Sequence, residues 1–244
     1  MISAENLTKI FDDPKRGEVV AAKDVSFTCE PGRIFGLLGP NGAGKTTTLR
    51  MLSTVLKPTS GTAKVAGFDI IKESQKVRKK IGFLSGDTGV YGRLSAKEMV
   101  EYFGRLYGMD EKDLKQKREK IFTLLEMNDF KDTRNDKLST GMKQKVNIAR
   151  TIIHNPPVLI LDEPTLGLDV ITSRTIVDFI RGCKDEGKCV LFSTHIMSEA
   201  ERLCNEIAII HKGTIFAVGN PQELKERTKT TNLEDAFLAL VREN

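Results

Sequence analysis

The chain has 244 residues, of which 39% are hydrophobic and 29% are charged, a composition typical of a globular protein and not of a disordered or fibrous one. Its 38 basic and 33 acidic residues leave a net charge of only +5. This surplus is too small for a basic nucleic-acid surface and no recognised binding module is present, so we expect no nucleic-acid partner.

The first part of the chain predicts short strands followed by a glycine-rich loop and a helix. Two β-like runs, VVAAKDVSFTCE at 19–30 and RIFGLLG at 33–39, are separated by the turn signal EPG. After the loop, leucines at 49, 52 and 56 follow helical spacing in KTTTLRMLSTVL. KPTSG then ends this helix, and TAKVAGFDI at 62–70 predicts a further strand.

From about residue 87 to 155, helical periodicity dominates, as in SAKEMVEYFGRLYG and EKIFTLLEMNDF. We interpret this segment as a helical subdomain inserted into an α/β core formed by residues 1–86 and 156–244. The whole chain is then a single α/β domain, with an N-terminal antiparallel β part and a mixed or parallel sheet.

Two continuous apolar runs in the last third, PPVLILDEP and KCVLFSTH, predict buried parallel strands. A helix is expected between them, over about residues 169–185. The tail predicts two short strands from IAIIHKGTIFAVG and an amphipathic helix from LEDAFLALVREN at 233–244.

The four cysteines stand at positions 29, 183, 189 and 204 without a C-x-x-C pair, so we expect free buried thiols in a reducing cytosol. The N-terminal residues show no signal sequence. The longest apolar runs, such as VLIL at 158–161, fall far short of the roughly 20 residues that span a bilayer. We therefore expect a cytoplasmic chain, and any membrane part must come from another polypeptide.

The strongest motif is GPNGAGKT at 39–46, which fits the phosphate-binding pattern G-x-x-x-x-G-K-[ST] between a predicted strand and a predicted helix. Backbone N–H groups of such a loop surround phosphate oxygens at a helix N-terminus. Lys45 can reach the β- and γ-phosphates, and the Thr46 hydroxyl can bind Mg²⁺. The expected nucleotide-binding residues of this loop are Gly39, Pro40, Asn41, Gly42, Ala43, Gly44, Lys45, Thr46 and Thr47.

A second motif, VLILDEP at 158–164, brings two acidic residues to the end of a predicted strand. Asp162 would hold Mg²⁺ there, and Glu163 would polarise the water that attacks the γ-phosphate. The alternative is that both acids merely end a strand at the solvent. Beside a phosphate-binding loop, we favour the catalytic interpretation.

The third motif is LSTGMKQK at 138–145. The phosphate loop, a helical insertion, LSTGM, LILDEP, GLD and a later histidine, in this order, resemble the ATP-binding subunits of ABC transporters over nearly the whole chain. The resemblance implies that Ser139 and Gly141 contact the γ-phosphate of ATP held by another subunit. Thr140 and Met142 replace the commonest Gly and Gln, but the serine hydroxyl and the second glycine remain.

The resemblance also assigns roles to three further residues. Phe11 is similar to the aromatic residue that stacks on adenine, the alternative being an ordinary core phenylalanine. Asp169 matches an aspartate that crosses the dimer interface, and it is also a plausible helix N-cap. His195 matches a histidine that senses the γ-phosphate, whereas His154 and His211 are expected at the surface.

The mechanism implied is a head-to-tail dimer that sandwiches two ATP molecules with Mg²⁺ and drives an integral membrane permease. The chain would then lie in the cytoplasm, peripheral on the inner face of the cell membrane. Its loops are most similar to those of bacterial exporters, particularly sodium-exporting ATPases of the NatA type. The permease would contact the face at 87–110, where Tyr91, Leu94, Met99 and Phe103 are either contacts or core.

Two competing functions remain. A soluble ABC ATPase of translation or DNA maintenance usually carries a second such domain or a long coiled coil, and neither fits in 244 residues. A kinase or GTPase with a phosphate-binding loop would leave LSTGM, GLD and His195 unexplained.

The stretch IGFLSGDTGVY at 81–91 departs from the family pattern, because Gly86 stands where relatives carry a glutamine that contacts Mg²⁺. Asp87 is a candidate replacement, since its carboxylate is a hard oxygen ligand. Alternatively, Asp87 caps the following turn and water fills the ligand position. The catalytic residues are all present, so we expect an active site with an altered coupling loop.

Overall fold

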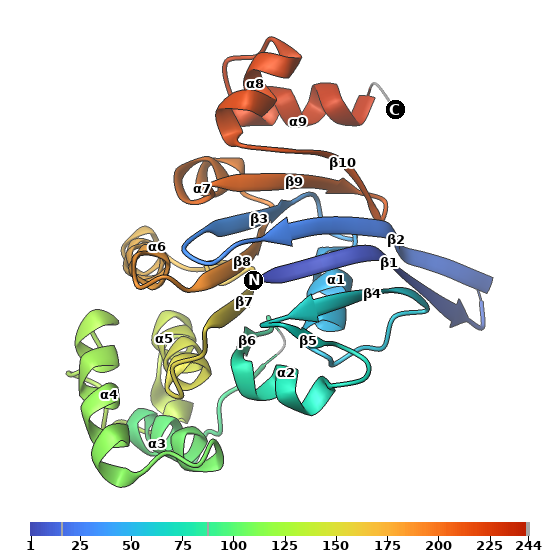
Figure 1. The fold of residues 1–244 in the computed structure, drawn as a ribbon. Helices are drawn as coiled ribbons and strands as arrows, with labels where there is room; N and C mark the ends of the chain where they lie inside the picture. The colour runs from blue at the N-terminus through green and yellow to red at the C-terminus, as the bar shows by residue number, and fades with distance from the viewer. Residues whose placement is uncertain (16, 87, 243–244) are drawn as a thin grey trace.

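The computed structural model describes residues 1–15, 17–86 and 88–242, which form two sheets surrounded by helices (Figure 1). The strands are β1 (Ile2–Asp13), β2 (Gly17–Cys29), β3 (Ile34–Leu38), β4 (Ser60–Val65), β5 (Phe68–Asp69), β6 (Ile81–Leu84), β7 (Val158–Asp162), β8 (Cys189–Thr194), β9 (Glu206–His211) and β10 (Thr214–Gly219). The α-helices are α1 (Lys45–Leu52), α2 (Ser74–Lys80), α3 (Ala96–Leu106), α4 (Glu111–Leu124), α5 (Thr140–Ile152), α6 (Val170–Asp185), α7 (Met197–Leu203), α8 (Pro221–Thr228) and α9 (Leu233–Arg242).

The smaller sheet is antiparallel, with strand order β2-β1-β4-β5. The larger sheet is mixed, with order β10-β9-β3-β8-β7-β6, in which β10 and β9 are antiparallel and the other neighbours are parallel. The expected α/β fold with an antiparallel N-terminal part and a mixed sheet is therefore confirmed. No helix in the described ranges has both the length and the apolar character needed to cross a bilayer.

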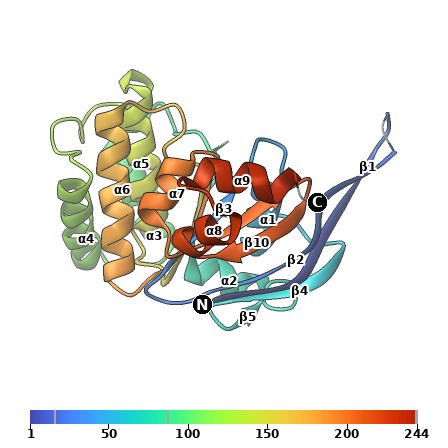
Figure 2. The same ribbon diagram turned by 90° about the horizontal axis from the view of Figure 1, so that it is seen from above.

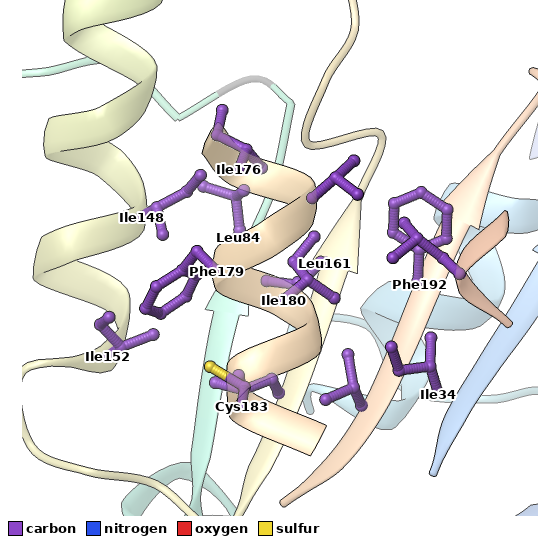
Figure 3. Close-up of a cluster of buried hydrophobic side chains, with 14 of the residues drawn as sticks. Ile34, Leu84, Ile148, Ile152, Leu161, Ile176, Phe179, Ile180, Cys183 and Phe192 are labelled. Atoms are coloured by element: carbon purple, nitrogen blue, oxygen red, sulfur yellow. The ribbon is translucent and has the colours of Figure 1, made fainter. Parts of the chain in front are cut away.

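The central strands of the mixed sheet are buried on both faces, which explains why their sequences are continuously apolar. On one face, Phe35 and Leu37 of β3 pack with α1 and the antiparallel sheet. On the other, Ile34 and Leu38 join a core that includes residues of α3 to α6. Figure 3 shows part of this second core, where α6 directs Ile180 and its neighbours toward the strands.

Helices α3, α4 and α5 lie to one side of the sheets in both views (Figures 1 and 2). Their termini are defined by side-chain caps: Ser95 and Glu98 form a reciprocal capping box at α3, and Asp110 accepts from two backbone N–H groups at α4. Helix α4 ends at Leu124, before the end of the helical pattern, and Glu126 adopts a positive φ of 53°. The two short helices α7 and α8 carry no long periodic pattern and were not expected.

The register of the parallel strands determines where the site forms. Leu38 of β3 is paired with Thr194 of β8, and Asp162 of β7 is paired with Ser193 of β8. The carboxyl ends of β3, β7 and β8 therefore meet at one edge of the sheet, where open α/β sheets bind their ligands.

Candidate active site

The loop between β3 and α1 has a backbone that requires glycine at defined positions. Gly44 has a φ of 100°, and a Cβ added there would lie 2.4 Å from the carbonyl oxygen of Ala21. A Cβ added at Gly39 would lie 2.1 Å from the carbonyl oxygen of Ile210. The glycines thus let the loop pass close to neighbouring backbone.

This loop borders a cavity of about 280 Å³ at the carboxyl edge of the mixed sheet. The cavity is lined by Ala21, Asn41, Gly42, Ala43, Gly44, Lys45, Thr46, Thr47 and Glu163. It therefore combines most of the predicted phosphate loop with the predicted catalytic glutamate. Ala21 was not predicted, because an alanine at the middle of a strand gives no chemical signal in the sequence.

Lys45, the first residue of α1, is 4% exposed and is held by three oxygen atoms. Its Nζ donates to the carbonyl oxygen of Gly39 at 2.7 Å and to that of Pro40 at 3.1 Å. It also lies 3.2 Å from Oε1 of Glu163. The ammonium group is thus fixed at the cavity wall, where its positive charge would favour an anion such as phosphate.

Asp162 ends β7 and is buried, and its carboxylate is oriented by the neighbouring strand. Ser193 Oγ donates to Asp162 Oδ1 at 2.6 Å, and the same hydroxyl accepts from the backbone N–H of Glu163 at 3.0 Å. Glu163 has a φ of 45°, a left-handed conformation that turns the chain sharply after the strand. Ser193 is a site residue that sequence analysis missed, since its role depends on the pairing of β8 with β7.

Glu163 connects Lys45 to the predicted switch histidine. Its Oε1 faces Lys45, and its Oε2 lies 2.8 Å from Nδ1 of His195. The structure therefore brings together three residues, predicted as the catalytic set, that are far apart in the sequence. Each carboxylate oxygen of Glu163 thus contacts one neighbour, Lys45 or His195. Either neighbour could instead bind a phosphate or a water molecule.

The donor set at this edge fits a hard divalent cation. The Asp162 carboxylate uses Oδ1 for Ser193, and Thr46 is among the residues that line the adjacent cavity. Among the described residues, no group of three or more His, Cys, Asp or Glu residues forms a complete metal cage. Mg²⁺ is usually held by one or two protein oxygens together with waters and substrate phosphates, and the side chains of Asp162 and Thr46 are oxygen donors of that kind.

The predicted signature residues lie away from the cavity of their own chain. Ser139 caps α5, its Oγ accepting from the backbone N–H of Met142 at 3.2 Å. A Cβ at Gly141 would lie 3.0 Å from Oγ1 of Thr172, so α5 and α6 begin side by side. Asp169 caps α6 by accepting from the N–H and the hydroxyl of Thr172, as its N-cap interpretation predicted.

Phe11 lies on β1 opposite Val19 and is 41% exposed, so it is not a core phenylalanine. Lys9 Nζ stands 5.1 Å from its ring centroid. Phe11 does not line the cavity beside Glu163, and its role as an adenine-stacking residue stays a prediction.

In the coupling loop at 81–91, the structure describes every residue except Asp87. The metal role proposed for Asp87 therefore lies outside the described residues. A Cβ at Gly86 would meet nothing within 4 Å, so neighbouring atoms leave room for a side chain at this position. Of the residues proposed for permease contact, Met99 is fully buried and Leu94 and Phe103 pack against the core. Tyr91 is 54% exposed.

Comparisons with known proteins agree with this geometry. A family model described as "ABC transporter" matches residues 22–166. The chain is 42% identical to "ABC transporter ATP-binding protein NatA" of Bacillus subtilis, over 98% of this chain and 97% of that protein. It is 32% identical to "Linearmycin resistance ATP-binding protein LnrL" of the same species, over 99% of this chain and 79% of that one.

Two solved structures are similar over most of their length. One, described as "Structure of ATP binding subunit of ABC transporter", has a TM-score of 0.89 at 25% identity and covers 99% of both chains. The other is the cassette MJ0796, solved as a dimer in a post-hydrolysis state with ADP and Pi. Its TM-score is 0.81 at 26% identity, over 90% of this chain and 98% of that chain.

Proposed function

Since this chain belongs to the ABC transporter family, as one of its ATP-hydrolysing ATP-binding subunits, we propose that it powers export by a separate integral membrane permease. The observation that carries this proposal is the position of Glu163 between Lys45 and His195 at the cavity wall. That arrangement supports the proposed roles of Glu163 as a base-like carboxylate, of Lys45 as a phosphate-binding cation and of His195 as a hydrogen-bonding imidazole.

In the proposed reaction, the N–H groups of loop 39–47 and the Lys45 ammonium hold the phosphates of ATP. Thr46 and Asp162 would hold Mg²⁺, which would supply charge neutralisation at the phosphates. Once Lys45 contacts a phosphate, the Glu163 carboxylate is free to orient and polarise the attacking water. His195 then donates a hydrogen bond from its imidazole N–H to the γ-phosphate and so senses its presence.

We propose that two copies close head to tail, so that Ser139 and Gly141 of one copy complete the nucleotide site of the other. This is supported by their separation from the cavity of their own chain and by the dimeric state of the similar cassette. Apolar side chains around the segment of Asp169 also support it, because Val170 is 84% exposed and Ile171 is 77% exposed. An interface between copies would cover this surface.

The division into an ATPase core, 1–86 and 156–244, and a helical subdomain, 87–155, remains our proposal, as does the location of the permease contact on the subdomain. Exposed apolar residues there include Tyr91, Tyr102 and Leu106. A protein that binds them at a membrane would hold this chain in the cytoplasm, against the inner face. The transported species proposed is sodium, supported by the 42% identity to the NatA protein.

Co-purification tests the transport role. We expect the chain to be recovered from membranes in a complex with a polytopic protein, and the complex to move radioactive sodium in vesicles only with ATP. A complex that hydrolyses ATP but moves no sodium would reject the cargo alone. Recovery on ribosomes or DNA without a membrane partner would reject the transport role and favour a soluble ABC ATPase.

A further inference from the structure

Glu199 lies on α7, outside the motifs that identify the site, yet it connects two of them. Its Oε2 accepts a hydrogen bond from Oγ1 of Thr165 at 2.8 Å. The same oxygen accepts from Oγ1 of Thr194 at 3.2 Å. A single carboxylate oxygen thus joins Thr165 and Thr194, which are 29 residues apart in the sequence.

Thr165 belongs to the turn that follows Glu163. Its side chain is buried, and the turn is closed by hydrogen bonds from Leu166 N–H to the Glu163 carbonyl and from Leu168 N–H to the Thr165 carbonyl. Gln144 of α5 also donates to the Pro164 carbonyl at 2.7 Å. The glutamate turn is therefore held by side chains of both α5 and α7.

Thr194 directly precedes His195 at the end of β8 and is 2% exposed. Its carbonyl oxygen accepts from the backbone N–H of Gly39, the first residue of the phosphate loop, at 3.4 Å. Its hydroxyl accepts from the N–H of Ile196 while donating to Glu199. The position of the histidine segment is thus fixed through the threonine hydroxyl.

We propose that Glu199 is a positioning residue for ATP hydrolysis, which clamps the turn after Glu163 to the segment that carries His195. This inference rests on the proposed roles of those two residues. Glu199 acts through the two threonines and touches neither ATP nor water. Without the clamp, the two segments keep the pairing of β7 with β8 but lose this link beyond the strand ends, so the separation of the carboxylate and the imidazole is less tightly fixed.

The two bonds end on one oxygen, so the clamp requires an acceptor of the right length and not a negative charge. The carbonyl oxygen of a glutamine can accept from both hydroxyls, because it has two lone pairs. An aspartate is one methylene shorter and withdraws the oxygen from both threonines. The expected order of activity is therefore Glu and Gln together, followed by Asp and Ala.

The experiment measures ATP hydrolysis by the purified chain with Glu199→Ala, Glu199→Gln and Glu199→Asp. Glu199→Ala is expected to lower kcat at least tenfold, with KM for ATP and the unfolding temperature close to those of the wild type. Glu199→Gln should stay within twofold of the wild-type kcat. Glu201→Ala is the matched control on the same helix, since Glu201 pairs with Lys225, and it should also stay within twofold.

Thr165→Val tests the clamp without changing α7. Valine has the shape of threonine but lacks the hydroxyl that donates to Glu199. We expect it to lower kcat, and we expect Thr165→Val combined with Glu199→Ala to be no slower than Glu199→Ala alone. Wild-type kcat in both single variants would overturn the clamp. A glutamine variant as slow as the alanine variant would overturn it too, because charge would then be the requirement.

Glu163→Gln, measured beside these variants, separates this inference from the site on which it rests. If Glu163→Gln hydrolyses ATP as the wild type does, the assignment of the site is wrong. If Glu163→Gln is inactive while Glu199→Ala and Thr165→Val are fully active, only the clamp is wrong.

Discussion

Nδ1 of His195 lies 2.8 Å from Oε2 of Glu163, and the other oxygen of this carboxylate lies 3.2 Å from Lys45. The glutamate thus holds the two groups that a γ-phosphate would also contact. In the proposed mechanism, a phosphate entering the site would compete with Glu163 for Lys45 and release one carboxylate oxygen for water. Binding of the substrate and freeing of the base-like group would then be one event.

Glu163→Gln should retain ATP binding and lower turnover by about 10²–10⁴-fold, because the amide is a poor proton acceptor. The loss of charge also removes repulsion toward the γ-phosphate, so the ATP-bound dimer should persist longer. Steady-state hydrolysis and size-exclusion chromatography with ATP measure the two effects. Turnover equal to that of the wild type would exclude Glu163 from this role.

Lys45→Ala should weaken ATP binding itself, by about ten- to a hundredfold in Kd, since a charge-assisted hydrogen bond contributes about 1.5–3 kcal/mol. The variant also leaves the Glu163 carboxylate without its cation partner. Isothermal titration with a non-hydrolysable ATP analogue measures the change. Lys64→Ala, an exposed lysine on β4, is the control and should bind normally.

Gly44→Ala and Gly42→Ala distinguish strain from collision in the phosphate loop. Both glycines have positive φ, but only at Gly44 would the new methyl group meet backbone, at 2.4 Å from the Ala21 carbonyl oxygen. We expect Gly44→Ala to lose ATP binding more than tenfold and Gly42→Ala to lose much less. Equal losses in the same titration would mean that collision with Ala21 plays no part.

Gly182→Ala should stabilise the protein, because Gly182 lies within α6 and a Cβ there meets nothing within 4 Å. Alanine in a helix is favoured over glycine by about 0.5–1 kcal/mol, or about 1–4 °C in a domain of this size. Gly104→Ala in α3 is the opposite case, since its Cβ would lie 2.4 Å from Leu114 Cδ1. Differential scanning fluorimetry should show Tm rising for the first and falling for the second.

The stability of the protein should fall as pH decreases from about 6.5 to 4, through His154. Burial lowers the pKa of His154 to about 4; its Nε2 lies 3.0 Å from the Ile81 carbonyl oxygen, and its ring stacks on Tyr107. The unfolded chain binds the proton near pH 6.5, so the contribution is complete above that value and is lost toward pH 4. Histidine 154 is therefore not the surface residue that its sequence context suggested.

Urea unfolding at pH 7 and pH 4.5 measures this dependence, for which we expect on the order of 1–3 kcal/mol. His154→Phe keeps a ring for Tyr107 but has no titrating group. Its free energy of unfolding should therefore change less between the two pH values. The same pH dependence in both proteins would assign the effect to other groups.

The parts of the site that could be predicted are those whose sequence motif is formed by consecutive residues. Loop 39–46 and the acidic pair at the end of β7 were recognised because each motif is adjacent to its supporting strand. Ser193 and Glu199 were missed because their partners are determined by sheet register and by the packing of α7, which no local pattern contains. Asp169 had two interpretations, and the structure shows the N-cap one directly.

All four cysteines are buried and free, and burial raises the pKa of the Cys183 thiol to about 12. Thiol reagents react with exposed thiolates, so the native protein should be nearly inert toward maleimides. A cysteine introduced on the surface, for example at Tyr91 or Val170, would then be labelled selectively without removing any native thiol. Probes attached at such single cysteines would follow the proposed dimer closure and the proposed permease contact in real time.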